Sequence, residues 1–418
     1  MKSSTRLALF VVAVLFAAVE MRAQESSAVR PRVVTPAQEQ QIPAQPTVPQ
    51  ARPSDVGAPL PSVEIDAQKK ASAPITHLTP SVIQGRISEA QRMFKTRPKP
   101  TAMAVGQIDF VTIAALDRET ARTHFITVLK KTFLTKGSEI VTTTSEGTNV
   151  TVRIVRANGV NTAMTIFTTD GKTLAPLTIE YPIERGGKFL ETAYYSSAHP
   201  ALLSPDLVRS GQGYVRNMLD LAAKRLRDKG VAISPMLVDV AERLCVVEHV
   251  DHQRFRDENR IALYDEIYSL FALNQIDTYR FSVSSAGAGG MVQMIPWAYN
   301  LERTRYPGVG LIPDFVTGMR NHGNALQAML LYMHDTWNEM NASDEVKYAL
   351  GAKIATPSEL LAAGYNSNAA RLPGYLKRGG DGWRTLIPRE TQMYLQIYKS
   401  FEGLVPMQNR AADYADLR

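Results

Sequence analysis

The segment from Ser284 to Pro296 combines small residues and an amide where a bound chain could lie close to the backbone. It reads Ser-Ser-Ala-Gly-Ala-Gly-Gly-Met-Val-Gln-Met-Ile-Pro. Glycines such as Gly287 permit close approach of a ligand, and the Gln293 side chain can hydrogen-bond the hydroxyl and acetamido groups of a sugar. The Lys and Ser/Thr of a phosphate-binding loop do not follow these glycines. These residues are compatible with contact to a saccharide, and a glycine-rich loop taken alone is most often a turn.

Two later segments contain further polar and aromatic side chains. The first is Leu-Ala-Ala-Gly-Tyr-Asn, which ends with Tyr365 and Asn366. The second is a Glu-Thr pair followed by a tyrosine, which contributes Glu390 and Tyr394. Aromatic faces can stack on sugar rings, so both tyrosines are candidates for a saccharide groove.

The tryptophans lie in the same part of the chain, at positions 297, 337 and 383. They are compatible with a saccharide groove because aromatic rings stack on sugars. Trp337 belongs to the helical run 326–340, so core packing is the better interpretation for this residue.

In this order and at this spacing, the three segments resemble those of soluble lytic transglycosylases and goose-type lysozymes, and the resemblance covers residues 235–405. It implies an all-α lysozyme-like domain that acts on or binds peptidoglycan glycan strands at the MurNAc–GlcNAc linkage. It implies no cofactor and no metal. By their match to the three segments, the substrate-binding residues would be Ser284, Gly287, Gln293, Tyr365, Asn366, Glu390 and Tyr394.

The sequence departs from this family at the position of the catalytic acid. In the family one glutamate serves as acid and then as base, and the 6-hydroxyl of the substrate closes an anhydro ring. Counting back twelve residues from Gly287 gives Gln275, whose amide cannot supply a proton. A loop shorter by two residues would place Asp277 there as an alternative acid. Glu266 lies nine residues from Gln275, about 180° around a helix, and is rejected as the acid.

Two interpretations of function remain open from the residues. The chain is a lytic transglycosylase-like enzyme with Asp277 or an unrecognised carboxylate as its acid, or it is a pseudoenzyme. In the second case it is a non-catalytic glycan-binding protein or a scaffold in an envelope complex. The chemistry at Gln275 alone favours the second interpretation.

Other chemistry-bearing residues lack a recognisable arrangement. Glu248-His249 and His252 contain two histidines three positions apart without a third ligand nearby, so a solvated helical face is the better interpretation. His322 and His334 lie in helical sequence without metal spacing. The only cysteine, Cys245, falls in an apolar helical pattern, which predicts a buried thiol and excludes an intrachain disulfide.

The N-terminal residues predict export. Lys2 and Arg6 precede an apolar run from Leu7 to Val19, and a small residue follows at Ala23. Residues 1–23 therefore match a signal peptide, and the run is short for a membrane span. The predicted location is periplasmic or secreted, and a retained anchor stays open. The formal net charge of +7 is mild for 418 residues, and no nucleic-acid partner is predicted.

The remaining chain divides by composition and pattern. Residues 24–100 are predicted as a disordered Pro/Gln/Ala-rich linker. Residues 101–205 are predicted as a small α+β domain that could contact envelope proteins, with a connecting helix at 206–234. The all-α domain follows at 235–405, and 406–418 is a tail. The predicted fold class is thus an α+β multidomain protein.

Within residues 101–205, local patterns predict one helix and several strands. Asp117 could cap a helix through Ile126 and Leu129. Alternating apolar residues over 150–155 predict a strand, and further strands are expected at 163–167 and 177–181. Turn dipeptides connect these runs and predict hairpins, namely Asn158-Gly159 and Asp170-Gly171.

After Leu202 the apolar pattern becomes helical. One helix should bury a single face and end near Gly230. The next should begin at Ser234-Pro235, which resembles an N-cap and first helical position. The residues on the predicted face of the first helix are Val215, Met218, Leu219, Ala222 and Leu226.

Overall fold

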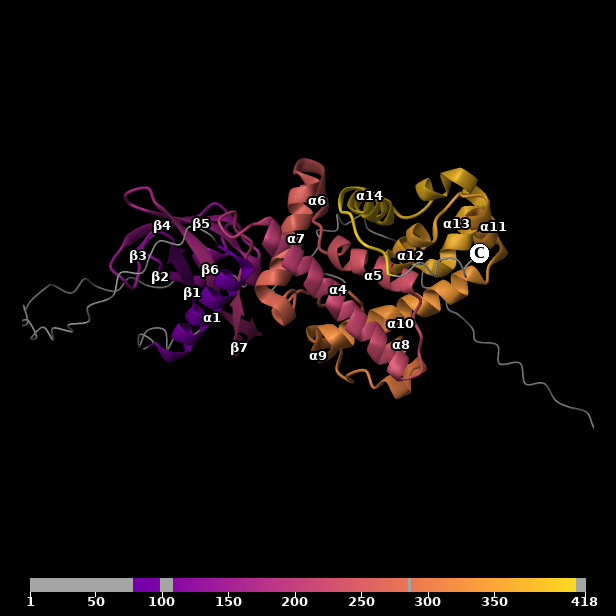
Figure 1. The fold of residues 1–418 in the computed structure, drawn as a ribbon, viewed down its shortest axis with the longest axis horizontal. Coiled ribbons are helices and arrows are strands. Elements are labelled where there is room, and N and C mark those ends of the chain that lie inside the picture. Colours follow the sequence, from indigo (N-terminus) through magenta and orange to yellow (C-terminus); the bar gives the residue numbers. More distant parts are fainter. Residues whose placement is uncertain (1–77, 98–107, 285–286, 411–418) are drawn as a thin grey trace, which may run out of the picture.

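The computed structural model describes residues 78–97, 108–284 and 287–410, and it has a sheet domain at one end and a helical domain at the other (Figure 1). The predicted signal peptide and the linker up to residue 77 lie outside the described residues. The α+β fold class is confirmed. None of the described helices is long and apolar enough to cross a membrane.

The sheet domain is an antiparallel half-barrel. Its strand order is β2-β1-β6-β5-β4-β3, and β7 pairs with β6. The long strand β6 pairs in turn with β5, β1 and β7, so it joins the two parts of the sheet. The strands are β1 (Phe110–Asp117), β2 (Arg122–Leu129), β3 (Glu139–Thr143), β4 (Asn149–Arg156), β5 (Ala163–Thr168), β6 (Thr173–Arg185) and β7 (Lys188–Tyr195).

The curvature of the sheet brings β2 close to the end of β3 and the turn that follows it. The backbone N–H of Ser145 donates to the carbonyl of Phe125 at 2.8 Å, and His124 pairs with Thr144 at 3.2 Å. The short helix α3 (Lys130–Phe133) follows β2, and the 3-10 turn η1 (Gly159–Asn161) separates β4 from β5. Both predicted hairpin dipeptides therefore lie between antiparallel strands, and the strand predicted over 150–155 is confirmed.

The helix predicted from Asp117 is wrong, because 110–129 is the hairpin of β1 and β2. Asp117 accepts hydrogen bonds from the backbone N–H groups of Glu119 and Thr120, at 2.9 and 3.4 Å. Those bonds close a tight turn in the same way that they would cap a helix. Asp117 therefore forms the side-chain hydrogen bonds expected of a helix cap, but they stabilise the turn between β1 and β2.

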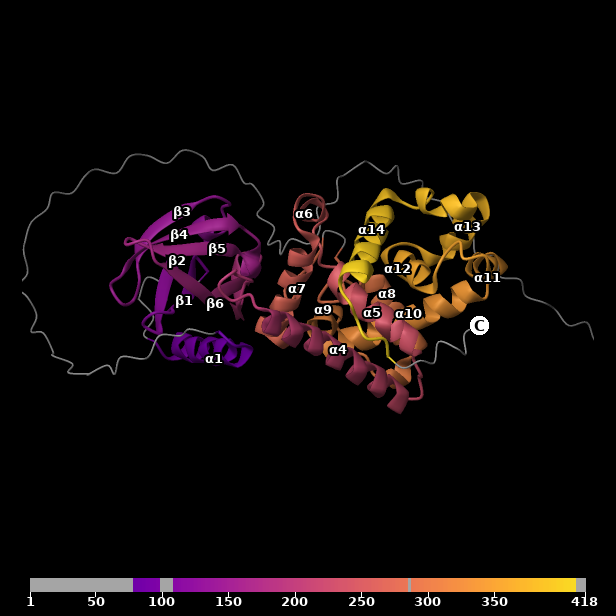
Figure 2. The same cartoon turned by 45° about the horizontal axis from the view of Figure 1, so that its top comes forward.

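Helix α1 (Pro80–Thr96) occupies part of the stretch predicted as linker. Thr79 caps it by accepting from the backbone N–H of Val82. Its buried side chains, which include Ile83 and Phe94, pack against the sheet, and α1 lies alongside β1 and β6 (Figure 2). The linker prediction therefore fails at least over 80–96, where an amphipathic helix belongs to the sheet domain.

The helical domain contains the remaining elements. They are α4 (Pro205–Asp228), α5 (Pro235–Val247), α6 (His252–Asp257), α7 (Arg260–Asn274), η2 (Gln275–Asp277), α8 (Pro296–Arg305), η3 (Pro307–Val309), α9 (Phe315–Arg320), α10 (His322–Asn341), α11 (Asp344–Gly351), α12 (Pro357–Asn366), η4 (Ala369–Arg371), α13 (Leu372–Gly379), η5 (Gly380–Thr385) and α14 (Arg389–Leu404). Ser234 caps α5 as predicted, and Cys245 is buried as predicted.

Helices α4 and α7 cross at very short range. A Cβ atom on Gly211 would lie 1.9 Å from the carbonyl oxygen of Tyr268, so only glycine allows this approach. The face of α4 predicted from periodicity is buried at Val215, Leu219, Ala222 and Leu226, and Met218 is partly buried. Gly230, with φ +85°, follows the end of α4.

Helix α7 also joins the two domains. Phe271 belongs to the core of the helical domain, whereas Leu270 belongs to the core of the sheet domain. Asn274 exchanges two hydrogen bonds with the backbone of Ser196, at 2.7 and 2.8 Å. The Arg156 guanidinium of β4 pairs with Glu266 at 2.8 Å. The two domains are therefore docked through a helix that is apolar on several sides.

Candidate functional site

The glycine-rich segment is a compact irregular loop before α8. Gly289 forms isolated β-bridges with Val283 on one side and Met294 on the other. Gly290 has φ +68°, and a Cβ atom there would lie 2.4 Å from the carbonyl oxygen of Met319 in α9. Ser284 is one of the residues that the sequence analysis predicted to bind substrate. Its hydroxyl oxygen accepts a hydrogen bond from the backbone N–H of Ala288 at 3.0 Å.

Gln293 lies where this loop turns into α8. Its backbone has φ +47°, which is uncommon for a residue other than glycine. The side-chain amide donates to the carbonyl of Gly290 at 2.8 Å and to the Ser282 hydroxyl at 3.3 Å. The amide is therefore held in one orientation by its own loop.

Helix α12 contacts the glycine-rich loop through a hydrogen bond. The Tyr365 hydroxyl donates to the carbonyl of Val292 at 2.6 Å, next to Gln293. The Oδ1 atom of Asn366 is buried and has no hydrogen-bond partner among the described residues. The structure thus brings Tyr365 of α12 to the glycine-rich segment.

A carboxyl group that the sequence interpretation set aside meets the third predicted segment. Tyr394 of α14 is fully buried, and its hydroxyl donates to Oε1 of Glu248 at 2.6 Å. Glu248 is the C-cap residue of α5, and only 6% of it is exposed. Because the Tyr394 ring is enclosed in the core, it cannot stack on a sugar, and its hydroxyl is the group that reaches the site.

His249, next to Glu248, reaches the glycine-rich segment directly. Its Nε2 lies 2.9 Å from the carbonyl oxygen of Met291. Burial lowers the pKa of His249 to about 3, so the ring is neutral at physiological pH. Because a carbonyl only accepts, Nε2 carries the proton. The solvated helical face expected for Glu248 and His249 is wrong, since both side chains are buried.

Two further histidines, His322 and His334, form hydrogen bonds within the helical domain. Burial lowers the pKa of His322 to about 4, and its ring lies between the Tyr214 hydroxyl at 2.9 Å and the carbonyl of Thr278 at 2.8 Å. His334 pairs with Asn338 of the same helix at 3.1 Å. Over the described ranges, no group of three His, Cys, Asp or Glu side chains is placed to hold a metal ion.

The residues predicted at the acid position lie at the end of α7. Gln275 has an exposed side chain and φ +48°. Asp277 accepts a hydrogen bond from Arg280 at 3.0 Å. Burial acts to raise the pKa of Glu266, but hydrogen bonds from Arg254 and the charges of Arg156 and Arg254 outweigh it and lower that pKa. The structure therefore joins Glu248, and not one of these three residues, to Tyr394.

Sequence reasoning missed Glu248 because α6, α7 and η2 lie between it and the glycine-rich segment. An ungapped count back from Gly287 ends at Gln275, the first residue of η2. One signal was available. The run over 244–247 is apolar and ends directly on Glu248, and a charged side chain inside a buried pattern is uncommon unless it has a specific partner.

The remaining predicted residues occupy different environments. Trp297 is 66% exposed at the start of α8, beside the glycine-rich segment. Trp337 is buried in the core as predicted, and Trp383 is also buried. Glu390 is exposed in the first turn of α14.

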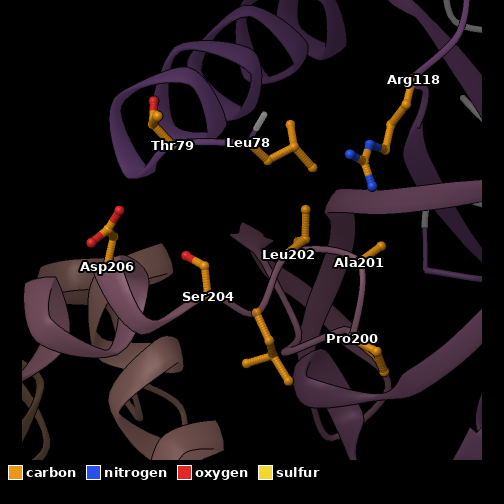
Figure 3. Close-up of a pocket in the computed structure, with 9 residues that line it drawn as sticks. Leu78, Thr79, Arg118, Pro200, Ala201, Leu202, Ser204 and Asp206 are labelled. Carbon is orange, nitrogen blue, oxygen red and sulfur yellow. The ribbon is translucent and has the colours of Figure 1, made fainter. Parts of the chain in front are cut away.

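A separate hollow of about 340 Å³ lies where α1, the β1–β2 turn and the start of α4 meet. Figure 3 shows Leu78 and Leu202 on opposite walls, with Arg118 nearby. Its lining residues include none of the predicted site residues. They are Leu78, Thr79, Arg118, Pro200, Ala201, Leu202, Leu203, Ser204 and Asp206.

The candidate site thus combines a buried carboxyl group on α5, a tyrosine from α14, a tyrosine from α12 and the glycine-rich loop. These parts come from distant stretches of the chain, and each is tied to another by a hydrogen bond. Comparison with family models, with curated proteins and with solved structures found no match for this chain, so the assignment of a function rests on these residues.

Proposed function

We propose that this chain is an exported lytic transglycosylase-like enzyme that cleaves the MurNAc–GlcNAc linkage of peptidoglycan glycan strands, with Glu248 as its acid. The observation that carries the proposal is the 2.6 Å hydrogen bond from Tyr394 to Glu248. It joins a carboxyl group to one of the three segments that resemble the family. The proposal replaces Gln275 and Asp277 by a buried carboxyl group.

The environment of Glu248 supports this role. Glycosidic cleavage needs a carboxylic acid that protonates the leaving oxygen, and such acids have restricted contact with water. Glu248 is 6% exposed, and the Tyr394 hydroxyl fixes the orientation of its carboxyl group. A fixed orientation reduces the entropy that must be lost before proton transfer.

The proposed reaction uses one carboxyl group twice. Glu248 transfers its proton to the bridging oxygen while the bond from that oxygen to C1 of MurNAc breaks. The resulting carboxylate takes the proton of the 6-hydroxyl of the same sugar, and the hydroxyl oxygen bonds to C1. A 1,6-anhydro ring forms, Glu248 is protonated again, and water is not consumed. The step requires no metal or cofactor.

Binding of the glycan is assigned to the loop and to α12. The Gln293 amide is held in place by its own loop. The Oδ1 atom of Asn366 is buried, so Asn366 stays a prediction as a substrate contact. Ser284, Gly287, Glu390 and Tyr365 stay predictions as substrate contacts, as does a role of the sheet domain in envelope-protein contacts.

Incubation of the full chain with purified peptidoglycan sacculi tests the proposal. Mass spectrometry should detect soluble muropeptides with anhydro ends, and their release should fall by at least about 100-fold in Glu248→Gln. Glu339→Gln is the control, because Glu339 is exposed on α10. Binding to sacculi without any release by the wild-type chain would overturn the proposal and support the non-catalytic interpretation.

A further inference from the structure

Tyr279 stacks on the residue that follows the proposed acid. The rings of Tyr279 and His249 lie with centroids 3.4 Å apart and planes 2° apart. Tyr279 follows η2, in the stretch between Glu248 and the glycine-rich segment. The stack therefore holds this stretch against the C-terminal end of α5.

Tyr279 also belongs to both domains. It packs against the core of the helical domain and against the core of the sheet domain. Tyr195 of β7 is hydrogen-bonded to the backbone of Tyr279, and Phe271 of α7 meets the Tyr279 ring edge-on at 5.5 Å. The backbone of Tyr279 has φ +57°, a conformation that persists only where the surroundings impose it.

The stack continues into the proposed site. His249 holds the carbonyl of Met291 at 2.9 Å, and the next carbonyl, that of Val292, is held by Tyr365 at 2.6 Å. Gln293 follows directly. A rotation of the His249 ring would thus move the glycine-rich segment relative to Glu248. The Tyr279 ring blocks that rotation on one face.

The sheet domain holds this arrangement from outside as well. Glu191 of β7 pairs with Arg280 at 3.3 Å and with Arg320 of α9 at 2.8 Å. Arg280 directly follows Tyr279, and α9 supports Gly290 through Met319. One strand of the sheet domain therefore fixes both flanks of the glycine-rich segment.

From these contacts we infer that Tyr279 is a positioning residue, which makes glycan cleavage by Glu248 depend on the docked sheet domain. The inference rests on the proposed function. Tyr279 acts through His249 and does not touch the glycan. Loss of its ring should lower kcat, because Glu248 and the bound linkage lose their alignment, while KM stays nearly constant.

Kinetics on soluble, uncrosslinked glycan strands test the inference with the full chain. We expect Tyr279→Leu to lower kcat at least tenfold with KM within twofold of the wild type. Tyr279→Phe should keep at least half of the wild-type kcat, because it preserves the stacked ring. Tyr181→Leu is the matched control, since Tyr181 lies in the core of the sheet domain and its ring packs against Phe133.

If Tyr279→Leu does not fold, the kcat of a second variant, Tyr195→Phe, tests the inference instead. Tyr195→Phe removes only the hydroxyl that meets the Tyr279 backbone, and it should lower kcat about threefold or more. An unchanged kcat in Tyr195→Phe would then overturn the inference. An unchanged kcat in folded Tyr279→Leu, or a rise in KM alone, would overturn it equally.

The failure of this inference differs from the failure of the proposed function. If the wild-type chain releases no product, the proposed function and the positioning role of Tyr279 are both contradicted. Release that is lost in Glu248→Gln but is unchanged in Tyr279→Leu removes only the positioning role of Tyr279.

Discussion

The Tyr394 hydroxyl and the Glu248 carboxyl group are joined by a hydrogen bond of 2.6 Å, although they lie 146 positions apart in the chain. Both side chains are buried. A buried hydrogen bond to a carboxyl group is costly to leave unmade, so each residue constrains the other. This bond links α14 to the end of α5, and the proposed reaction depends on it.

Removing this bond should weaken both cleavage and folding. We expect Tyr394→Phe to lower the rate of muropeptide release about tenfold, because the Glu248 carboxyl group loses its fixed orientation. The free energy of unfolding should fall by about 1–2 kcal/mol. Release assays and urea unfolding measure the two effects. Tyr348→Phe is the control because Tyr348 is 71% exposed, and equal release by both variants would contradict the role of Tyr394.

Gly290 and Gly289 offer a matched test of the glycine-rich loop. Gly290→Ala places a Cβ atom 2.4 Å from the backbone oxygen of Met319 at φ +68°, whereas a Cβ atom on Gly289 makes contacts of 3.5 Å or longer. We expect Gly290→Ala to lower the free energy of unfolding by about 2 kcal/mol or more and to reduce glycan binding. Gly289→Ala should change stability by less than about 1 kcal/mol. Similar losses in both variants, measured by urea unfolding, would contradict this account.

Glu302 should make the helical domain less stable as the pH rises. Burial, followed by the nearby Asp335 carboxylate, raises the pKa of Glu302 to about 8. The folded state keeps a proton that the unfolded state has lost, so stability is fully present below a pH of about 4.3 and declines up to pH 8. Glu302→Gln should flatten this decline and be more stable than the wild type at pH 9, by roughly 1–3 kcal/mol. Urea unfolding at pH 5, 7 and 9 tests this. Parallel pH profiles for the two proteins would contradict it.

A carboxylate at position 275 should not create activity. Gln275 is an exposed residue at the end of α7. We therefore expect Gln275→Glu to release muropeptides at the wild-type rate, within about twofold. A large gain in release would show that the ungapped count from Gly287 had identified the acid position, and it would exclude Glu248 from that role.

The parts of the site that could be predicted are those encoded by local pattern. The glycines of the loop need positive φ values or close packing, and their spacing carries that requirement. The Tyr365 and Tyr394 segments were identified by their order along the chain, and the structure brings both to the site. Their contacts could not be predicted. Tyr394 contributes its hydroxyl and not the stacking face that was expected.

The parts that could not be predicted depend on long-range placement. Helices α6 and α7 separate Glu248 from the glycine-rich loop along the chain, whereas the neighbouring His249 lies 2.9 Å from the carbonyl oxygen of Met291 in that loop. At Asp117 the ambiguity was local, because the same side-chain hydrogen bonds close a turn or cap a helix. At Glu248 and at Asp117 the outcome depends on contacts with residues elsewhere in the chain. A single sequence does not show which residues form these contacts.

The central claim is tested most directly by muropeptide release in Glu248→Gln and in Asp277→Asn, compared with the wild type in the same assay. We predict that release is lost in Glu248→Gln, which should still bind sacculi, and that Asp277→Asn keeps the wild-type rate. Release that survives in Glu248→Gln and vanishes in Asp277→Asn would contradict the assignment of Glu248 as the acid.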